Sequence, residues 1–333
     1  MKAVVIEEFG PPSKASLQDL PMPEPGPGQL LIEVEAAPVN FVDSLVFGGS
    51  YQFLPQRPFT PGKGPAGKIL ALGAGVEGFK TGQRVLGMAE HGGYAQAALV
   101  PAADSYVLPD SVSSEDAGVL SLAFDTAWTA LFEQGRMQPG ETVLVLGATG
   151  AVGNAAMQLA KIKGGRVLAA VSSPDRAEEV MRYGADGIID LSQENLRDSL
   201  RAQVHAQTGG KGADVVIDPL GGDIFDAALR AVAWRGRVVV VGFAAGRIPT
   251  IKANYLMLKN IEVSGLQVSD YRKRRPDILD AAFREILTLA AEGRILPGPR
   301  KTYPLEDFAT ALDDLLERRA RGRVLLLPNG SAA

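Results

Sequence analysis

The segment from Gly147 to Gly153 carries the most specific chemical signal in the chain. It reads Gly-Ala-Thr-Gly-Ala-Val-Gly and follows the apolar run TVLVL directly. Gly150 allows backbone to approach a pyrophosphate, Gly153 allows a helix to pack closely on a strand, and the free N–H groups of that helix attract an anion. Ala148 departs from the usual pattern by occupying the first glycine position. The cofactor contacts expected in this turn are Gly147, Thr149, Gly150, Ala151, Val152 and Gly153.

The end of the next apolar run bears on which nicotinamide cofactor the turn would hold. After RVLAAV the chain continues Ser172-Ser173-Pro174-Asp175-Arg176. NAD would call for an acid at the strand end to hold its ribose hydroxyls, whereas two hydroxyls and an arginine at a helix start suit a 2′-phosphate. The sequence therefore favours NADPH, with Ser172, Ser173 and Arg176 as ligands. Alternatively, Ser173 caps a helix and Arg176 is solvated; Asp175 argues against NADPH.

The elements that must position these residues alternate between strands and helices. Short runs that are apolar throughout, separated by helical segments, predict a parallel sheet covered on both faces. Six such runs make a doubly wound Rossmann fold over residues 123–265, and this context favours a cofactor site over a mere packing turn. The runs are TVLVL, RVLAAV, GIID, DVVID, RVVVVGF and IEVSGL; the helices between the first five cover Gly150–Lys163, Pro174–Tyr183, Asn195–Thr208 and Asp223–Trp234.

Residues 1–122 have a different character. Short extended runs punctuated by Gly, Pro and Asp predict an irregular, mostly antiparallel β domain. A single long helix is expected to begin after the Ser113 cap and to continue to about residue 135. The tail, 266–333, holds two predicted helices (Pro276–Glu292 and Leu305–Arg319) and the strand GRVLLLP. It is too short for a third domain, so we expect it to complete the first.

The composition narrows the range of partners and locations. The chain has 333 residues, 46% of them hydrophobic and 22% charged, with a net charge of −4. An acidic balance attracts neither nucleic acid nor an anionic membrane, so the expected partner is a small-molecule substrate. The first ten residues lack the long apolar core of a signal peptide, and no stretch approaches the roughly 20 apolar residues of a membrane span. These features predict a soluble, cytoplasmic protein.

Cysteine is absent, and only His91 and His205 represent histidine. The lack of cysteine excludes disulfides, cysteine-containing zinc sites, iron–sulfur clusters and thiol nucleophiles. The two histidines fall in different predicted domains, and we interpret both as surface residues. The sequence therefore predicts no metal site.

Seven segments together give the chain a family resemblance. In order along the chain they are AAPVNFVDSLVFGGSY, PGKGPAGKILALGAGV, GQRV, GGYAQ, the GATGAVG turn, DPLGG and ANYLMLKNIEVSG. Nearly the whole chain resembles the medium-chain dehydrogenase/reductase superfamily, in its zinc-independent quinone oxidoreductase (zeta-crystallin-like) branch. The resemblance implies a GroES-like catalytic domain, a Rossmann domain, a cleft between them, and a homodimer joined through the edges of the Rossmann sheets.

The resemblance also bears on metal binding. Zinc-dependent members of the superfamily place a cysteine before the Asp of the early helix, Gly-His-Glu in the following turn, and a further cysteine on the long helix. This chain has Asn40-Phe-Val-Asp43, Gly62-Lys63-Gly64 and residues 122–126 (Leu-Ala-Phe-Asp-Thr) at those places. The resemblance therefore implies chemistry without zinc.

Five further site residues are implied by the resemblance alone. Asn40 would line the nicotinamide side of the cleft, Thr126 would lie near the nicotinamide, and backbone at Gly242 and Phe243 would meet the carboxamide. Asn254 would contact the cofactor from the loop before the last strand. Local alternatives are a helix cap for Asn40, a hydroxyl bonding back to the preceding turn for Thr126, and plain core for Phe243.

The expected activity is hydride transfer from NADPH to a quinone or another α,β-unsaturated carbonyl compound. One alternative is an enone or enoyl-thioester reductase, in which Tyr51 donates a proton; the other role open to Tyr51 is that of a loop aromatic at the pocket rim. A second alternative is a non-catalytic, crystallin-like protein that binds NADPH. The basic run Arg272–Arg275 is interpreted either as a solvated surface or as a phosphate site for a CoA-linked substrate. Lys63 and Leu45 differ from the residues usual at those places in the branch, so the resemblance does not define the acceptor pocket.

Overall fold

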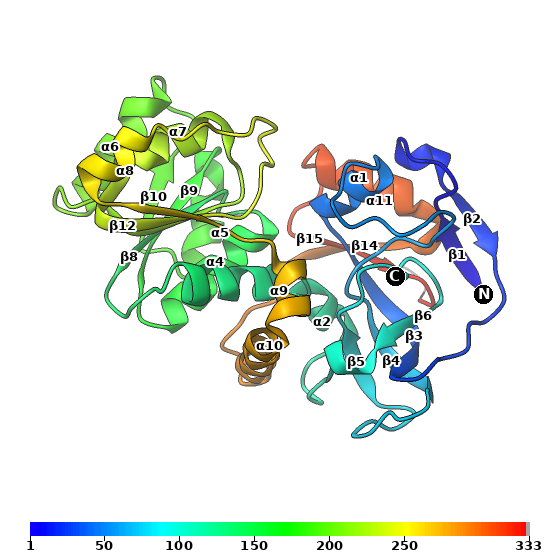
Figure 1. Cartoon of the computed structure of the whole chain (residues 1–333). Helices are drawn as coiled ribbons and strands as arrows, with labels where there is room; N and C mark the ends of the chain where they lie inside the picture. The colour runs from blue at the N-terminus through cyan, green and yellow to red at the C-terminus, as the bar shows by residue number, and fades with distance from the viewer. Residues whose placement is uncertain (331–333) are drawn as a thin grey trace. The chain divides into compact units, whose positions relative to one another are not determined.

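The computed structural model describes residues 1–330 and divides them into two compact units (Figure 1). Unit 1 comprises Met1–Leu122, Phe283–Gly293 and residues 297–330. Unit 2 comprises Ala123–Ala282 and Arg294–Leu296. Residues 266–282, in the segment expected to complete the first domain, thus cluster with unit 2.

Unit 2 is built on a six-stranded parallel sheet in the order β10-β9-β8-β11-β12-β13. In this order β8, the first strand along the chain, lies in the middle of the sheet. The next two strands are added on one side of it and the last three on the other, which is the doubly wound Rossmann topology. The Rossmann prediction is therefore confirmed. The strands are β8 (Thr142–Leu146), β9 (Arg166–Val171), β10 (Gly187–Asp190), β11 (Ala213–Asp218), β12 (Val232–Val240) and β13 (Glu262–Gly265).

Helices cover the sheet of unit 2 because its central strands are apolar on both faces; every residue of β8 is buried. Figure 1 shows α6 and α7 on one face and α4 on the other. None of the helices in the described part of the chain has the length and apolarity needed to span a membrane. The helices of unit 2 are α3 (Ala123–Trp128, continued by a π-helical turn), α4 (Ala151–Ile162), α5 (Ala177–Arg182), α6 (Leu196–Gln207), α7 (Gly222–Ala231), α8 (Ala253–Lys259) and α9 (Val268–Arg274).

Unit 1 contains a seven-stranded sheet, in which β14-β15-β3-β4-β5-β7 form the path and β6 pairs with β3, and a two-stranded sheet of β1 and β2. All pairs are antiparallel except β14 with β15. The mostly antiparallel β fold expected for this region is therefore confirmed. The strands are β1 (Lys2–Val5), β2 (Ser16–Asp19), β3 (Gln29–Val39), β4 (Ala66–Leu72), β5 (Arg84–Gly87), β6 (Ala97–Pro101), β7 (Ser105–Val107), β14 (Arg300–Pro304) and β15 (Arg323–Leu327).

The tail of the chain joins this sheet through β15, which pairs with β3 so that Val324 lies opposite Val39. The helices of unit 1 are α1 (Phe41–Phe47), α2 (Ser114–Leu120) and α11 (Phe308–Leu316). Helix α10 (Pro276–Ala291) begins in unit 2 and ends in unit 1. The pairing of β15 with β3 brings Arg323 beside Asn40 at the start of α1.

Three element predictions were wrong in detail. The long helix expected from Ser113 is broken between α2 and α3, where Leu122 adopts a φ of 57°. Buried Ser121 packs so tightly on Gly64 that a Cβ there would lie 2.0 Å from the Ser121 hydroxyl oxygen. The helix expected to reach Trp234 ends at Ala231, and strand β12 begins at the next residue. Asn254, expected in a loop, lies in α8.

Candidate functional site

The glycine turn after β8 has the geometry of an anion site. Gly147 adopts a φ of 61°, and a Cβ on Gly153 would lie 2.2 Å from the Gly147 carbonyl oxygen, so only glycine lets α4 approach the strand this closely. Gly150 is the N-cap of α4 and supplies no side-chain cap. The first helical bond runs from the Asn154 N–H to the Gly150 carbonyl at 2.8 Å. The N–H groups of the first turn are therefore available to a bound pyrophosphate.

The strand ends beside this turn carry several of the other predicted cofactor residues. Ser172 and Ser173 follow β9, and Gly242 and Phe243 follow β12 after one intervening residue. Because all these strands are parallel, these residues share one edge of the sheet with the glycine turn. Phe243 is 38% exposed, so its alternative interpretation as plain core is wrong.

Arg176 and Ser173, the predicted 2′-phosphate ligands, each contact a carboxylate. The Arg176 guanidinium donates two hydrogen bonds to Glu179, and the Ser173 hydroxyl donates to Asp175. Ser173 precedes a 3-10 turn but its side chain makes no cap hydrogen bond, contrary to the capping alternative. Hydrogen bonding to Glu179 raises the pKa of Arg176 above its usual range.

Two predicted cofactor residues lie on helices. Thr126 is buried on α3, where its N–H and hydroxyl both contact the Asp125 carboxylate, at 2.6 and 3.4 Å. The neighbouring Thr129 hydroxyl donates to the Asp125 carbonyl at 2.8 Å. Asn254 is exposed on α8. Cofactor contact by Thr126 and Asn254 stays a prediction.

The basic run Arg272–Arg275 is held by carboxylates of unit 2. The Arg272 side chain is 8% exposed and lies 3.2 Å from the fully buried Asp125. Burial raises the pKa of Asp125, and the Arg272 charge opposes that shift. Arg274 pairs with Asp270 at 2.8 Å and Arg275 with Asp277 at 2.8 Å. The buried pair was missed in the sequence because its members are 147 residues apart.

In unit 1, Asn40 belongs to a buried polar cluster at the start of α1. Asn40 is the N-cap of this helix, and its backbone N–H donates to Asp43 at 2.7 Å. Asp43 also accepts a hydrogen bond of 2.9 Å from the Tyr94 hydroxyl. Arg323, from β15, donates to the Asn40 side-chain oxygen at 2.9 Å. Asn40 therefore occupies the cap position of α1, while its side-chain oxygen accepts from Arg323.

Burial dominates the electrostatics of this cluster. It raises the pKa of Asp43 from 3.8 to about 6, although hydrogen bonds from Asn40 and Tyr94 and the charges of Lys63 and Arg323 oppose the shift. Burial also lowers the pKa of Arg323 to about 10, against the attraction of Asp43. A carboxyl group with such a pKa exchanges its proton close to neutral pH.

The structure brings Tyr51 and Lys63 together. The Lys63 side chain is 3% exposed and forms an ion pair with Glu90. Its ammonium nitrogen lies 4.5 Å from the centroid of the Tyr51 ring. The Lys63 turn sits close to Tyr94, because a Cβ on the neighbouring Gly62 would lie 2.2 Å from the Tyr94 ring. The Lys63 ammonium thus lies beside the phenol ring of Tyr51, the predicted proton donor of the alkene reductase alternative.

These residues do not fit a zinc ion. An ammonium group, that of Lys63, stands in the turn where zinc-dependent members carry histidine, and it would repel a divalent cation. The chain contains no cysteine. Within residues 1–330 no three His, Cys, Asp or Glu side chains gather in an arrangement that could hold a metal.

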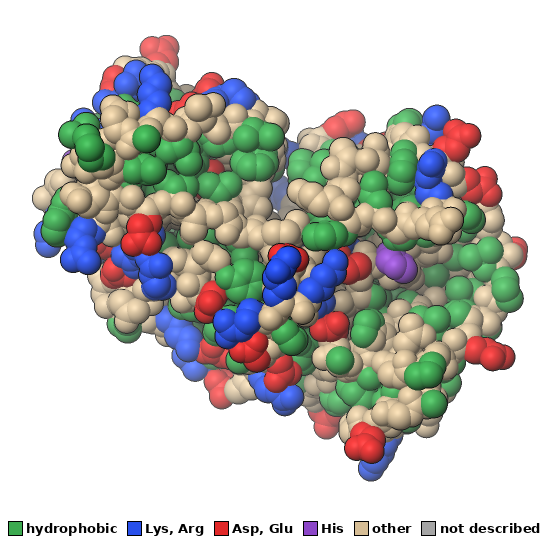
Figure 2. Space-filling view, in the orientation of Figure 1, with side chains coloured by type: hydrophobic (Ala, Val, Ile, Leu, Met, Phe, Trp, Pro, Cys, Tyr) green, Lys and Arg blue, Asp and Glu red, His purple; other side chains and the backbone are tan. Residues whose placement is uncertain are grey.

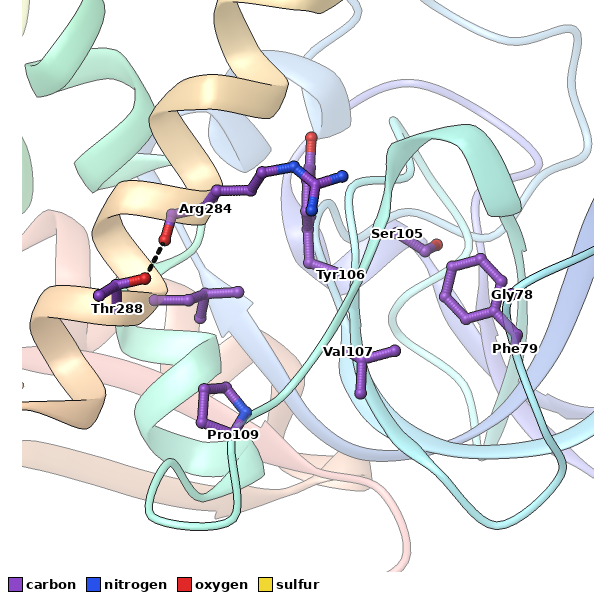
Figure 3. Close-up of a pocket in the computed structure, with 9 residues that line it drawn as sticks. Gly78, Phe79, Ser105, Tyr106, Val107, Pro109, Arg284 and Thr288 are labelled. Atoms are coloured by element: carbon purple, nitrogen blue, oxygen red, sulfur yellow. Dashed lines mark hydrogen bonds between the residues drawn. The ribbon is translucent and has the colours of Figure 1, made fainter.

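Figure 3 shows a cavity of about 580 Å³ in unit 1, bordered by the segment around β7 and by α10. The side chains of Tyr106 and Arg284 point toward one another at its wall. The lining residues are Gly78, Phe79, Ser105, Tyr106, Val107, Pro109, Arg284, Leu287 and Thr288. None of the predicted site residues lines this cavity. Figure 2 shows acidic and basic side chains interspersed on the visible face, without a broad basic surface.

Comparisons with known proteins give the family. The model "Alcohol dehydrogenase GroES-like domain" matches residues 26–110, and "Zinc-binding dehydrogenase" matches residues 151–284. Quinone oxidoreductase-like protein 2 of Rattus norvegicus is 35% identical over 98% of this chain and 91% of its own length. Quinone oxidoreductase of the same species is 34% identical over 98% of both chains.

Solved structures agree. A quinone oxidoreductase from Pseudomonas syringae superposes with a TM-score of 0.90 at 31% identity, over 98% of this chain and 99% of that one. The Escherichia coli quinone oxidoreductase complexed with NADPH gives a TM-score of 0.90 at 27% identity, over 98% of this chain and 100% of that one. The chain therefore belongs to the medium-chain dehydrogenase/reductase superfamily, in its zinc-independent quinone oxidoreductase branch.

Proposed function

We propose that this chain is an NADPH-dependent oxidoreductase that reduces a quinone or another α,β-unsaturated carbonyl compound without zinc. The observation that carries the proposal is the glycine turn, where Gly147, Gly150 and Gly153 leave the first N–H groups of α4 open to a pyrophosphate. The similar Escherichia coli structure is described as a quinone oxidoreductase complexed with NADPH, which supports the same cofactor here.

The protein's own groups would bind and orient. The α4 amides bind the pyrophosphate, the edge after β9 takes the adenosine ribose, and Gly242 and Phe243 after β12 meet the carboxamide. NADPH, when bound, supplies the hydride. Asn40 is suited to orienting the nicotinamide side because its side-chain oxygen accepts a hydrogen bond from Arg323, which leaves an N–H of its amide to face the cofactor. Reduction of a quinone then needs only protons from water.

Tyr51 and Lys63 favour a second candidate, reduction of an enone or enoyl thioester. That reaction adds hydride at the β carbon and a proton at the α carbon. Tyr51 would give the α proton, and the Lys63 ammonium, 4.5 Å from the ring centroid, would stabilise the tyrosinate left behind. The phenol would then recover its proton from solvent.

A homodimer is the proposed assembly, by analogy with the branch. Strand β13 is the last strand of the unit 2 sheet, and one of its edges has no neighbouring strand among residues 1–330. The two elements that precede β13 in the chain, β12 and α8, carry large exposed apolar side chains: Trp234, Met257 and Leu258 are each at least 68% exposed. Light scattering coupled to size-exclusion chromatography measures the mass directly.

The activity test uses purified protein, NADPH and a panel of quinones and enones, and follows loss of the reduced nicotinamide absorbance. Oxidation of NADPH by at least one acceptor supports the proposal. If calorimetry shows NADPH binding while no acceptor oxidises it, the reductase proposal is rejected in favour of a non-catalytic, crystallin-like binding protein.

Tyr51→Phe separates the two candidates because it removes only the phenolic proton. We expect its turnover number on an enone to fall by about 10²-fold while its rate on a quinone stays within twofold of the original. An unchanged enone rate would remove the proton-donor role from Tyr51.

A further inference from the structure

The two side chains best placed to hold a 2′-phosphate already donate to carboxylates of their own segment. Arg176, the last residue of the 3-10 turn Pro174–Arg176, donates from Nε to Glu179 Oε2 at 2.5 Å and from Nη2 to Glu179 Oε1 at 2.8 Å. The Ser173 hydroxyl donates to Asp175 Oδ1. Both donors are thus engaged by carboxylates in this structure.

The Arg176–Glu179 contact is more than a loose surface pair. Glu179 occupies the Nε and Nη2 side of the guanidinium group, and a parallel pair of bonds of this kind is the geometry by which arginine recognises phosphate. The two side chains are only 24% and 27% exposed, so water screens them incompletely. A phosphate approaching Arg176 must displace Glu179 or accept its negative charge at close range.

NADH places no such demand on the site. Its 2′-hydroxyl is neutral, so it needs no cation, and it is a hydrogen-bond donor for which nearby carboxylates are acceptable partners. The side chains that weaken a 2′-phosphate therefore leave a 2′-hydroxyl almost unaffected. The charge on Glu179 distinguishes the two coenzymes.

We propose that Glu179 sets the coenzyme preference of this chain, by engaging Arg176 and so weakening NADPH relative to NADH. The inference rests on the proposed function, since it concerns the same dinucleotide site, and it adds a specificity-determining residue to it. Glu179 thus reduces the preference of the native chain for NADPH, and removing its charge increases that preference.

The experiment compares Glu179→Gln with Glu178→Gln by calorimetric titration with NADPH and with NADH. Glu178 lies on the same helix, is exposed, and makes no ion pair among the described residues, so its replacement gives the same change in net charge without releasing Arg176. We expect Glu179→Gln to tighten NADPH binding about fivefold and to leave the NADH dissociation constant within about twofold. Glu178→Gln should move neither constant by more than about twofold.

A third protein, Arg176→Gln combined with Glu179→Gln, tests whether the gain passes through Arg176. In that background the tightening of NADPH should disappear. The inference is overturned if Glu179→Gln shifts both coenzymes equally, shifts neither, or keeps its gain without Arg176. Failure of the proposed function looks different. If the dinucleotide site itself is wrong, the native protein and all variants bind neither NADPH nor NADH; if only the reductase activity is wrong, both coenzymes still bind and no acceptor oxidises NADPH.

Discussion

Replacing Asp43 by asparagine tests the buried cluster of unit 1. Burial raises the pKa of this carboxyl group from 3.8 to about 6, so at pH 7 the folded protein holds an ionised group that the unfolded chain solvates better. The difference of about two pKa units corresponds to about 3 kcal/mol of lost stability at pH 7. Asparagine is nearly isosteric and cannot ionise, so it is free of this cost.

The sign follows from proton uptake. Because the folded state binds the Asp43 proton more tightly than the unfolded state does, the cost is fully present above pH 6 and disappears as the pH falls toward 3.8. About half of it is relieved by pH 5. The native protein should therefore gain stability relative to Asp43→Asn on acidification, and the gap between their unfolding free energies should close or reverse by about 1 to 2 kcal/mol between pH 7 and pH 5.

Urea titrations followed by far-ultraviolet circular dichroism at several pH values measure this gap. Fluorescence of Trp128 and Trp234, which both lie in unit 2, identifies the transition of that unit in the same samples. The control is Asp19→Asn, which removes an exposed carboxylate of unit 1. Parallel curves for the native protein and Asp43→Asn across this pH range would refute the assignment of the shift to burial.

Three further substitutions test unit 2. Gly153→Ala places a Cβ 2.2 Å from the Gly147 carbonyl oxygen and should lower the unfolding free energy by about 2 kcal/mol. In Gly150→Ala the corresponding distance is 3.2 Å, so this variant should bind NADPH more weakly with little change in melting temperature. Equal melting temperatures for the two variants would contradict the packing role of Gly153. Arg272→Met leaves the buried Asp125 carboxylate without its cation and should cost about 3 kcal/mol or more by tryptophan-monitored unfolding, and a cost below 1 kcal/mol would show that the pair contributes little.

The Rossmann unit was predictable because its signals are local. An apolar run such as 142–146 is buried on both faces and needs no distant information to be recognised as an inner strand. Gly153 was predictable for the same reason, since the residue that a side chain there would strike, Gly147, is six positions away. The edge that carries Ser172 and Gly242 follows from the parallel order of the strands alone.

Other features depend on chain segments that meet only in the folded protein. Arg323 contacts Asn40 across 283 positions of sequence, and periodicity does not encode such a pairing. The break at Leu122 lies against Gly64, which belongs to the turn before β4. The Arg176–Glu179 pair could have been anticipated, because residues three apart on a helical segment are neighbours. The sequence interpretation treated Arg176 as a phosphate ligand without considering Glu179, three residues later.

The buried charges of unit 1 give a physical reason for the replacement of zinc ligands in this chain. Asp43 and Glu90 are carboxylates, and protein cations accompany them: Lys63 forms an ion pair with Glu90, and the charges of Lys63 and Arg323 both act on Asp43. A divalent ion in the same place would meet carboxylates that already have cationic neighbours, and the Lys63 ammonium would repel it at close range. Conversely, exchanging Lys63 for a neutral histidine without supplying a metal would leave Glu90 half-buried without its cation. Lys63 therefore both supplies the cation that pairs with Glu90 and makes this place unfavourable for zinc.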